Sequence, residues 1–130
     1  MHVLVVDDDT AIRRLFARAL AKLGTVDEAA NGIDALRFIA TQRYDVMILD
    51  WHMPTMDGPA LLKLLAEKPG PNEDTPVVVI TADPSPNARE DAMHRGAIYF
   101  LQKPVKLGSL LVVVQTATQQ RQRHSRLSRI

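Results

Sequence analysis

Hydrophobic and polar positions along this chain follow two alternating periods. Uninterrupted aliphatic runs are typical of strands buried on both faces of a sheet, and such runs lie at residues 3–6, 46–49 and 77–80. Two further short stretches, at residues 25–29 and 98–101, are interpreted as strands. Between the strands, apolar residues recur at helical spacing. They predict helices at about residues 12–23, 32–41, 59–65, 87–95 and 107–120, and Gly24 is interpreted as the end of the first.

Strands that alternate with helices predict an α/β domain with five strands and five helices. Short connections and helical crossovers force neighbouring strands to run parallel. Right-handed crossovers then place helices on both faces of the sheet. The periodicity does not determine the strand order. The order 2-1-3-4-5 is one of two common solutions, and it would place the first and third strands side by side.

Composition narrows the class of protein. The chain has 130 residues, 46% of them hydrophobic, which suits one domain with a single core. It has no cysteine, which excludes disulfides, thiolate metal sites and cysteine nucleophiles. The apolar run at residues 3–6 is far too short for a signal-peptide core or a membrane span. We therefore expect a soluble, cytoplasmic protein with no membrane partner.

The net charge of +1 hides an asymmetry between the body of the chain and its end. Residues 121–130 hold four arginines and no acidic residue, so the other 120 residues hold 12 basic against 15 acidic residues, a net charge of −3. We interpret residues 1–120 as the domain and residues 121–130 as a basic C-terminal tail or linker stub. Nucleic acid is not expected as a partner, because the four arginines have no aromatic companions.

Polar residues whose side chains can bind ligands or take part in catalysis stand where the predicted strands end. Asp7 and Asp8 end the first strand, Asp50 ends the third, Thr81 ends the fourth and Lys103 lies just past the fifth. In an open parallel sheet, ligands bind outside the carboxyl ends of the strands. These residues, distant in sequence, are therefore expected to meet in one crevice.

Three carboxylates in one crevice would repel one another strongly. Two unit charges about 4 Å apart repel by about 4 kcal/mol at an effective dielectric constant of about 20, so one carboxyl would take up a proton unless a cation were bound. All-oxygen ligands favour Mg²⁺. A lysine and a hydroxyl beside a Mg²⁺-binding carboxylate indicate phosphoryl transfer, and aspartate is an established phosphoryl acceptor.

Each of these residues also has an ordinary interpretation when it is considered alone. An aspartate at a strand end is usually a turn residue, and an isolated lysine is usually an exposed charge. Asp8 and Asp9 both precede a predicted helix and suit its cap, and for Asp9 the cap is the favoured interpretation. The placement of acidic, hydroxyl and basic residues at four strand ends is what favours a phosphoryl site.

Four sequence motifs strengthen this interpretation. The segments VVDDD, LDWHMPTMDG, VVVITAD and GAIYFLQKPV, in this order, resemble the receiver domains of two-component response regulators. They are especially similar to single-domain chemotaxis-type regulators, and the resemblance covers about residues 2–120. It implies a flavodoxin-like doubly wound (βα)5 fold with a five-stranded parallel sheet in the order 2-1-3-4-5.

The resemblance also implies a role for each acidic residue. Asp50 would be the phosphoryl acceptor. Mg²⁺ would be the cofactor, with Asp8 and Asp50 as carboxylate ligands and the main-chain carbonyl of His52 as a third protein ligand. Asp7 would assist largely through water.

Further positions would respond to the phosphoryl group or tune its lifetime. Thr81 would donate a hydrogen bond to a phosphoryl oxygen, and Lys103 would pair with another, its bond to Pro104 being cis. Phe100 would be the switch aromatic, which turns inward when Thr81 moves. The side chains of His52 and Asp83 would flank the attacking water and tune the lifetime of the phosphate.

The function implied is that of a phosphorylation-dependent signalling switch. A sensor histidine kinase or a histidine phosphotransfer protein would donate to Asp50. The altered surface would then bind a downstream target protein or a fused output domain, and dimerisation on phosphorylation is allowed. Such a protein is not an enzyme, because it catalyses only its own phosphorylation and dephosphorylation.

Two alternatives remain open from the residues. One is a Mg²⁺-dependent phosphohydrolase with an aspartate nucleophile, but such enzymes usually place a second aspartate where this chain has His52. The other is a receiver-like scaffold that is never phosphorylated. The intact set of Asp8, Asp50, Thr81 and Lys103 argues against a scaffold.

Overall fold

All five strands run parallel in one sheet, in the order β2-β1-β3-β4-β5, which confirms both the predicted fold class and the strand order that the resemblance implied. The computed structural model describes residues 1–68, 70–83 and 85–128, with the backbone alone for residues 121–128. The strands are β1 (His2–Val6), β2 (Thr25–Ala29), β3 (Val46–Asp50), β4 (Val77–Thr81) and β5 (Tyr99–Gln102). They alternate with α1 (Thr10–Leu20), α2 (Gly32–Thr41), α3 (Gly58–Glu67), α4 (Pro86–His94) and α5 (Leu107–Ser128), and a short 3-10 helix η1 (Gly70–Asn72) precedes β4.

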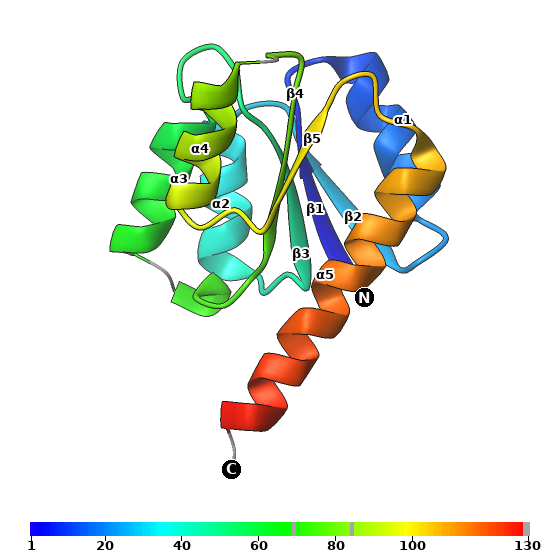
Figure 1. Ribbon diagram of the computed structural model, residues 1–130, viewed down its shortest axis with the longest axis vertical. Helices are drawn as coiled ribbons and strands as arrows, with labels where there is room; N and C mark the ends of the chain where they lie inside the picture. Colours follow the sequence, from blue (N-terminus) through cyan, green and yellow to red (C-terminus); the bar gives the residue numbers. More distant parts are fainter. Residues whose placement is uncertain (69, 84, 129–130) are drawn as a thin grey trace.

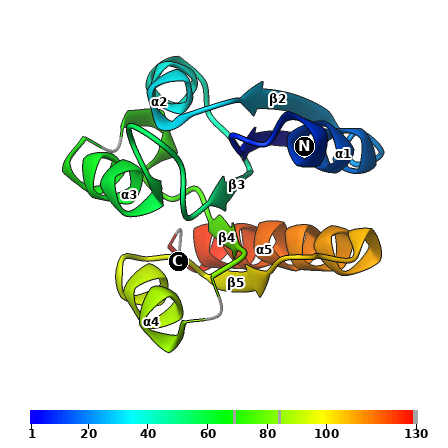
Figure 2. The ribbon, with the colours of Figure 1, turned by 90° about the horizontal axis from the view of Figure 1, so that it is seen from above.

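Two layers of helices sandwich the sheet, as Figure 2 shows: α2, α3 and α4 cover one face, and α1 and α5 cover the other. Successive strand residues point to opposite faces, so Leu4 and Leu49 join the core beneath α2–α4 while Val5 and Ile48 join the core beneath α1 and α5. Because β1, β3 and β4 are apolar on both faces, they occupy the centre of the sheet. Burying each large aliphatic side chain contributes about 1.5–3 kcal/mol.

The first helix ends earlier than the sequence predicted. It stops at Leu20, so Gly24 does not end it, and the need for glycine at position 24 has another structural reason. A Cβ atom at Gly24 would overlap the main-chain oxygen of Met1, which also accepts a hydrogen bond from the Thr25 N–H at 2.9 Å. Gly24 therefore lets the chain enter β2 close beside the start of β1.

The last helix is longer than predicted, so the prediction that it ends near Gln120 is wrong. Its backbone continues to Ser128, and Figure 1 shows the end of α5 projecting beyond the sheet. The apolar spacing stops near residue 120, but residues 121–128 include no glycine or proline and several good helix formers. Residues 129–130 of the predicted tail lie outside the described residues, and the division between domain and tail at residue 120 stays a prediction.

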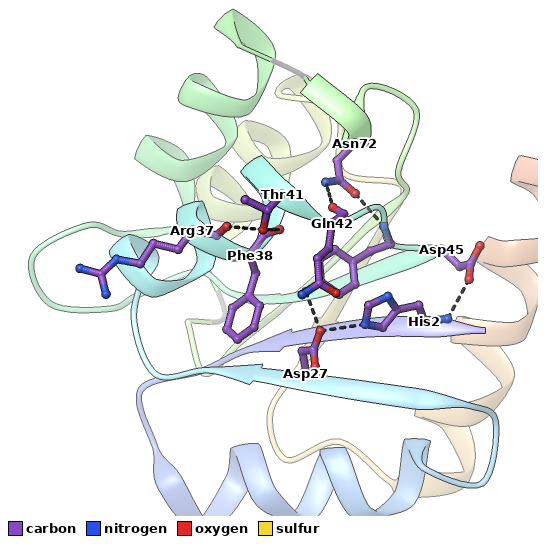
Figure 3. Close-up of polar contacts among 9 residues, drawn as sticks. His2, Asp27, Arg37, Phe38, Thr41, Gln42, Asp45 and Asn72 are labelled. Atoms are coloured by element: carbon purple, nitrogen blue, oxygen red, sulfur yellow. Dashed lines mark hydrogen bonds and ion pairs between the residues drawn. The ribbon is translucent and has the colours of Figure 1, made fainter.

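A polar network holds the amino-terminal end of the sheet (Figure 3). The Asp27 carboxylate accepts a hydrogen bond from the Tyr44 hydroxyl at 2.8 Å and lies 2.7 Å from Nε2 of His2. Burial raises the pKa of Tyr44, and the hydrogen bond to Asp27 raises it further, so the hydroxyl keeps its proton. Asn72 ties this end to η1 by accepting from the Tyr44 N–H at 2.8 Å.

The bounds of the remaining elements differ from prediction by only a few residues. Helix α4 begins at Pro86, one residue early, because the Ser85 hydroxyl accepts hydrogen bonds from the backbone of its first turn. Strand β5 begins and ends one residue later than predicted. Among the described residues, no helix combines the length and apolar character needed to cross a bilayer.

Candidate functional site

Three carboxylates converge at the carboxyl edge of the sheet, as the sequence predicted. Asp7 follows β1 and Asp50 ends β3, and these two strands are neighbours in the sheet. Asp7, Asp8 and Asp50 each place one carboxylate oxygen within 4.8 Å of the others. Asp7 and Asp50 are only 2% and 5% exposed, whereas Asp8 is open to solvent. The site therefore has two buried acids and one accessible acid.

Lys103 joins this cluster from the loop after β5. Its ammonium donates a hydrogen bond to the Asp7 carboxylate at 2.9 Å and lies 3.5 Å from the Asp50 carboxylate. Its backbone N–H donates to the main-chain oxygen of Thr81 at 2.8 Å, and the Lys103-Pro104 bond is cis, as expected. Burial alone would lower the pKa of Lys103, but the hydrogen bond to Asp7 and the charge of Asp50 raise it above its ordinary value. Lys103 thus stays charged beside the acids.

The carboxyl of Asp50 has a strongly perturbed pKa. Burial and then the charge of Asp7 raise its pKa, the charge of Lys103 lowers it, and the combined effect is a pKa of about 7. A single ammonium therefore does not offset the three acids. A divalent metal cation would offset their charge, and because these residues supply only oxygen ligands, they suit Mg²⁺.

Asp9 serves as the cap of α1, which confirms the favoured interpretation of this residue. Its carboxylate accepts a hydrogen bond from the Ile12 N–H at 3.1 Å, and its own N–H donates to Oδ1 of Asp7 at 2.9 Å. Since Lys103 holds Oδ2 of Asp7, both oxygens of that carboxylate already have donors. Asp8 and Asp50 are therefore the freer ligands.

The predicted switch residues lie on one face of the sheet. Val79 packs in the core beneath α2–α4, and strand alternation places Thr81 on the same side. Phe100 pairs in register with Val79 and packs against that same core, half-buried. Thr81 is fully buried, and its hydroxyl accepts a hydrogen bond from the Asp83 N–H at 3.1 Å. This arrangement allows a movement of Thr81 to reach Phe100.

A hydrogen bond between side chains links the two loops that flank the acidic cluster. Nε2 of His52 lies 2.9 Å from Oδ2 of Asp83, and the other oxygen of Asp83 accepts from the Ser85 N–H at 2.8 Å. The hydrogen bond to His52, followed by that to Ser85, holds the pKa of Asp83 below its ordinary value. The sequence indicated both residues but not their contact. Each stands two residues past the end of one of two neighbouring strands, which was the available signal.

Trp51, directly after Asp50, is part of a motif that carries the resemblance, but no role in the site was predicted for it from the sequence. It is 2% exposed, and Gly58 allows it to be covered, because a Cβ there would lie 2.6 Å from the indole ring. It is the single tryptophan of the chain. Its fluorescence therefore reports on the surroundings of Asp50.

Comparison with known proteins gives a consistent result. Residues 3–115 match the model of the response regulator receiver domain. The response regulator MprA of Mycobacterium tuberculosis is 38% identical over 112 residues, 85% of this chain and 47% of that protein, so this chain spans about half the length of that curated relative. Among solved structures, the receiver domain of Francisella response regulator 1452 has 32% identity and a TM-score of 0.83, covering 92% of this chain and 97% of that one. The chemotaxis protein CheY4 of Vibrio cholerae has 32% identity and a TM-score of 0.82, covering 89% and 97%.

Proposed function

The chain belongs to the receiver-domain family of response regulators, and from this premise we propose that Asp50 accepts the phosphoryl group of a two-component signalling pathway. The observation that carries the assignment is a buried carboxylate at the end of β3, 3.5 Å from a lysine ammonium and beside two further acids. Asp8 and Asp50 would hold Mg²⁺, with the main-chain carbonyl of His52, and Asp7 would assist through water. When bound, the cation would neutralise charge on the phosphoryl oxygens.

The phosphoryl donor in this proposal is the phosphohistidine of a sensor histidine kinase or of a histidine phosphotransfer protein. An oxygen of Asp50 attacks phosphorus in line, the phosphorus–nitrogen bond breaks, and the imidazole of the donor leaves with the bonding electrons. Lys103 offsets the charge on a phosphoryl oxygen. Because its ammonium already lies between Asp7 and Asp50, only a short movement is needed.

The signal would leave the site through Thr81 and Phe100. The Thr81 hydroxyl would donate a hydrogen bond to a phosphoryl oxygen, and Phe100 would follow Thr81 on the same face of the sheet. Phosphorylation would then shift an existing equilibrium between two surfaces built from α4, β5 and α5. A downstream target or a fused output domain would bind the altered surface in the cytoplasm, and the domain would catalyse only its own phosphorylation and dephosphorylation.

Acetyl phosphate with Mg²⁺ tests this proposal. We expect intact-mass spectrometry to show one added phosphoryl group, and beryllofluoride, which mimics the aspartyl phosphate, to change the fluorescence of Trp51. Sustained turnover of small phosphate esters would instead indicate a phosphohydrolase. A protein that binds neither reagent would be a scaffold.

Removal of Mg²⁺ should stop the labelling. With EDTA in place of Mg²⁺, we expect no added phosphoryl group, because Lys103 alone does not offset the negative charge of the cluster and the incoming phosphate. Titration of Mg²⁺ into the metal-free protein should change the fluorescence of Trp51, since Trp51 directly follows Asp50 in the chain. NaCl at equal ionic strength is the control for general salt effects. Undiminished labelling in EDTA would contradict the cation role.

Breaking the His52–Asp83 pair should shorten the lifetime of the aspartyl phosphate. The pair joins two loops beside Asp50, so we expect it to restrict the approach of water. A hydrogen bond worth about 1 kcal/mol corresponds to a roughly five-fold change in rate, so the half-life in Asp83→Ala should fall by about that factor. Asp83→Asn, which keeps a hydrogen-bonding side chain, is the matched control. A longer half-life in Asp83→Ala would show that the pair delivers water.

A further inference from the structure

The main chain of Asp7 is held as firmly as its carboxylate. Its N–H donates to the carbonyl of Ala29 at 3.1 Å, and its two carboxylate oxygens accept from the Asp9 N–H and from Lys103. Its main-chain oxygen accepts a hydrogen bond from Nη1 of Arg13 at 3.0 Å. Every polar atom of Asp7 thus has a partner, and Arg13 supplies the one on the carbonyl.

Arg13 does not extend into solvent like its neighbour Arg14. Its side chain is only 11% exposed, although it lies in the first half of a surface helix. The guanidinium bends back over the start of α1 and also donates from Nε to the carboxylate of Glu28 at 3.2 Å. Since ordering an arginine side chain costs conformational entropy, two directed hydrogen bonds to separate elements indicate a defined position.

The backbone of Glu28 is held by the sheet, because every residue of β2 pairs with β1. Its neighbour Asp27 points to the opposite face, where His2 and Tyr44 hold its carboxylate (Figure 3). Glu28 then presents its carboxylate to Arg13 on the α1 side. A chain of contacts therefore runs from the network at Asp27, through β2 and Arg13, to the loop that carries the acidic cluster.

We propose that Arg13 is a positioning residue for the cation site. The carbonyl of Asp7 belongs to the same rigid planar peptide group as the nitrogen and Cα of Asp8. By holding that carbonyl, Arg13 sets the direction in which the exposed Asp8 carboxylate projects toward Asp50, and Glu28 keeps Arg13 in place. This inference rests on the proposed function, because it concerns the same cation site.

Positioning and charge predict effects of opposite sign. A guanidinium near a cation site repels the cation, so removing the charge alone would strengthen Mg²⁺ binding. Removing the contact to the Asp7 carbonyl would weaken binding, since partners that orient metal ligands typically affect metal affinity by 10- to 100-fold. Glu28 offsets much of the charge of Arg13, which leaves positioning as the larger effect.

Mg²⁺ titrations of the full chain separate these effects, with calorimetry and Trp51 fluorescence as readouts. We expect Arg13→Met to raise the Mg²⁺ dissociation constant by about ten-fold. Arg14→Met removes the same charge from the adjacent, exposed position, and is expected to leave the dissociation constant unchanged or slightly lower. Arg13→Lys should recover part of the affinity. Glu28→Gln should weaken binding less than Arg13→Met, and the double variant should bind no more weakly than Arg13→Met.

The thermal midpoint in EDTA identifies a merely structural role. If Arg13→Met melts earlier than wild type but binds Mg²⁺ with equal affinity, or binds it as tightly as Arg14→Met does, the positioning role is wrong. If Arg13→Met does not fold, Glu28→Gln decides, because an unchanged Mg²⁺ affinity in that variant contradicts the chain of contacts. A wild-type protein that binds no Mg²⁺ contradicts the proposed function itself, whereas these variant comparisons concern Arg13 alone.

Discussion

Asp50→Asn is expected to reduce phosphoryl labelling by acetyl phosphate and Mg²⁺ to background. The substitution keeps the size and most contacts of the side chain but replaces the nucleophilic carboxylate with a neutral amide that does not attack phosphorus. Asp7 and Asp8 remain, yet Asp7 has both oxygens occupied by hydrogen-bond donors, and Asp8 is open to water. Intact-mass spectrometry measures the labelling, and beryllofluoride should no longer change Trp51 fluorescence.

Two other substitutions serve as controls for this result. Asp8→Asn should leave the acceptor in place but weaken Mg²⁺ binding, so labelling should slow and recover at higher Mg²⁺ concentration. Asp9→Asn should have no effect, because asparagine caps a helix about as well as aspartate does and Asp9 caps α1. Undiminished labelling of Asp50→Asn would show that another residue is the acceptor, and peptide mapping would identify it.

The central part of the fold was predictable because its sequence signal is strong. The runs at residues 3–6, 46–49 and 77–80, within β1, β3 and β4, are apolar at every position, a pattern typical of strands covered on both faces. Ends of elements were less predictable. The helix propensity of residues 121–128 continues α5 past the spacing of its apolar residues, and α1 ends at Leu20, whereas Gly24 allows the close approach of Met1.

The acidic cluster was predictable because parallel strands bring their carboxyl ends to one edge. Asp7, Asp8 and Asp50 meet there as expected. The hydrogen bonds that surrounding side chains make to this cluster were not predictable, because they depend on side-chain directions that no local sequence pattern specifies. Arg13 has the periodicity of an exposed helical residue, and its hydrogen bond to the Asp7 carbonyl emerges only from the packed structure.

The raised pKa of Asp50 predicts how the stability of the metal-free protein depends on pH. Burial, followed by the charge of Asp7, raises this pKa from 3.8 to about 7 in the folded protein. A carboxyl with a raised folded-state pKa contributes stability that is fully present below its unfolded-state pKa and is lost as the pH rises through the folded-state value. The metal-free wild type should therefore lose stability between about pH 4 and pH 7 because of this group.

Asp50→Asn lacks this ionisation, so its advantage over wild type should grow across the same interval. One pKa unit corresponds to about 1.4 kcal/mol, so the shift from 3.8 to about 7 predicts an added free energy of unfolding on the order of 4 kcal/mol above about pH 7.5. Urea unfolding in EDTA at about pH 5 and about pH 8 measures the difference. Asp9→Asn is the matched control, because it removes a neighbouring carboxylate that caps a helix in solvent.

Mg²⁺ provides the decisive second arm of this experiment. A cation bound by the folded wild type stabilises it by mass action, so saturating Mg²⁺ should reduce or reverse the advantage of Asp50→Asn at about pH 8. The protein that cannot be phosphorylated would thus be the more stable one without metal and would lose that advantage with it. If the variant and the wild type unfold alike in EDTA at high pH, the buried carboxylate is not destabilising. Asp50 would then lack the unfavourable charge that makes the cluster a cation site.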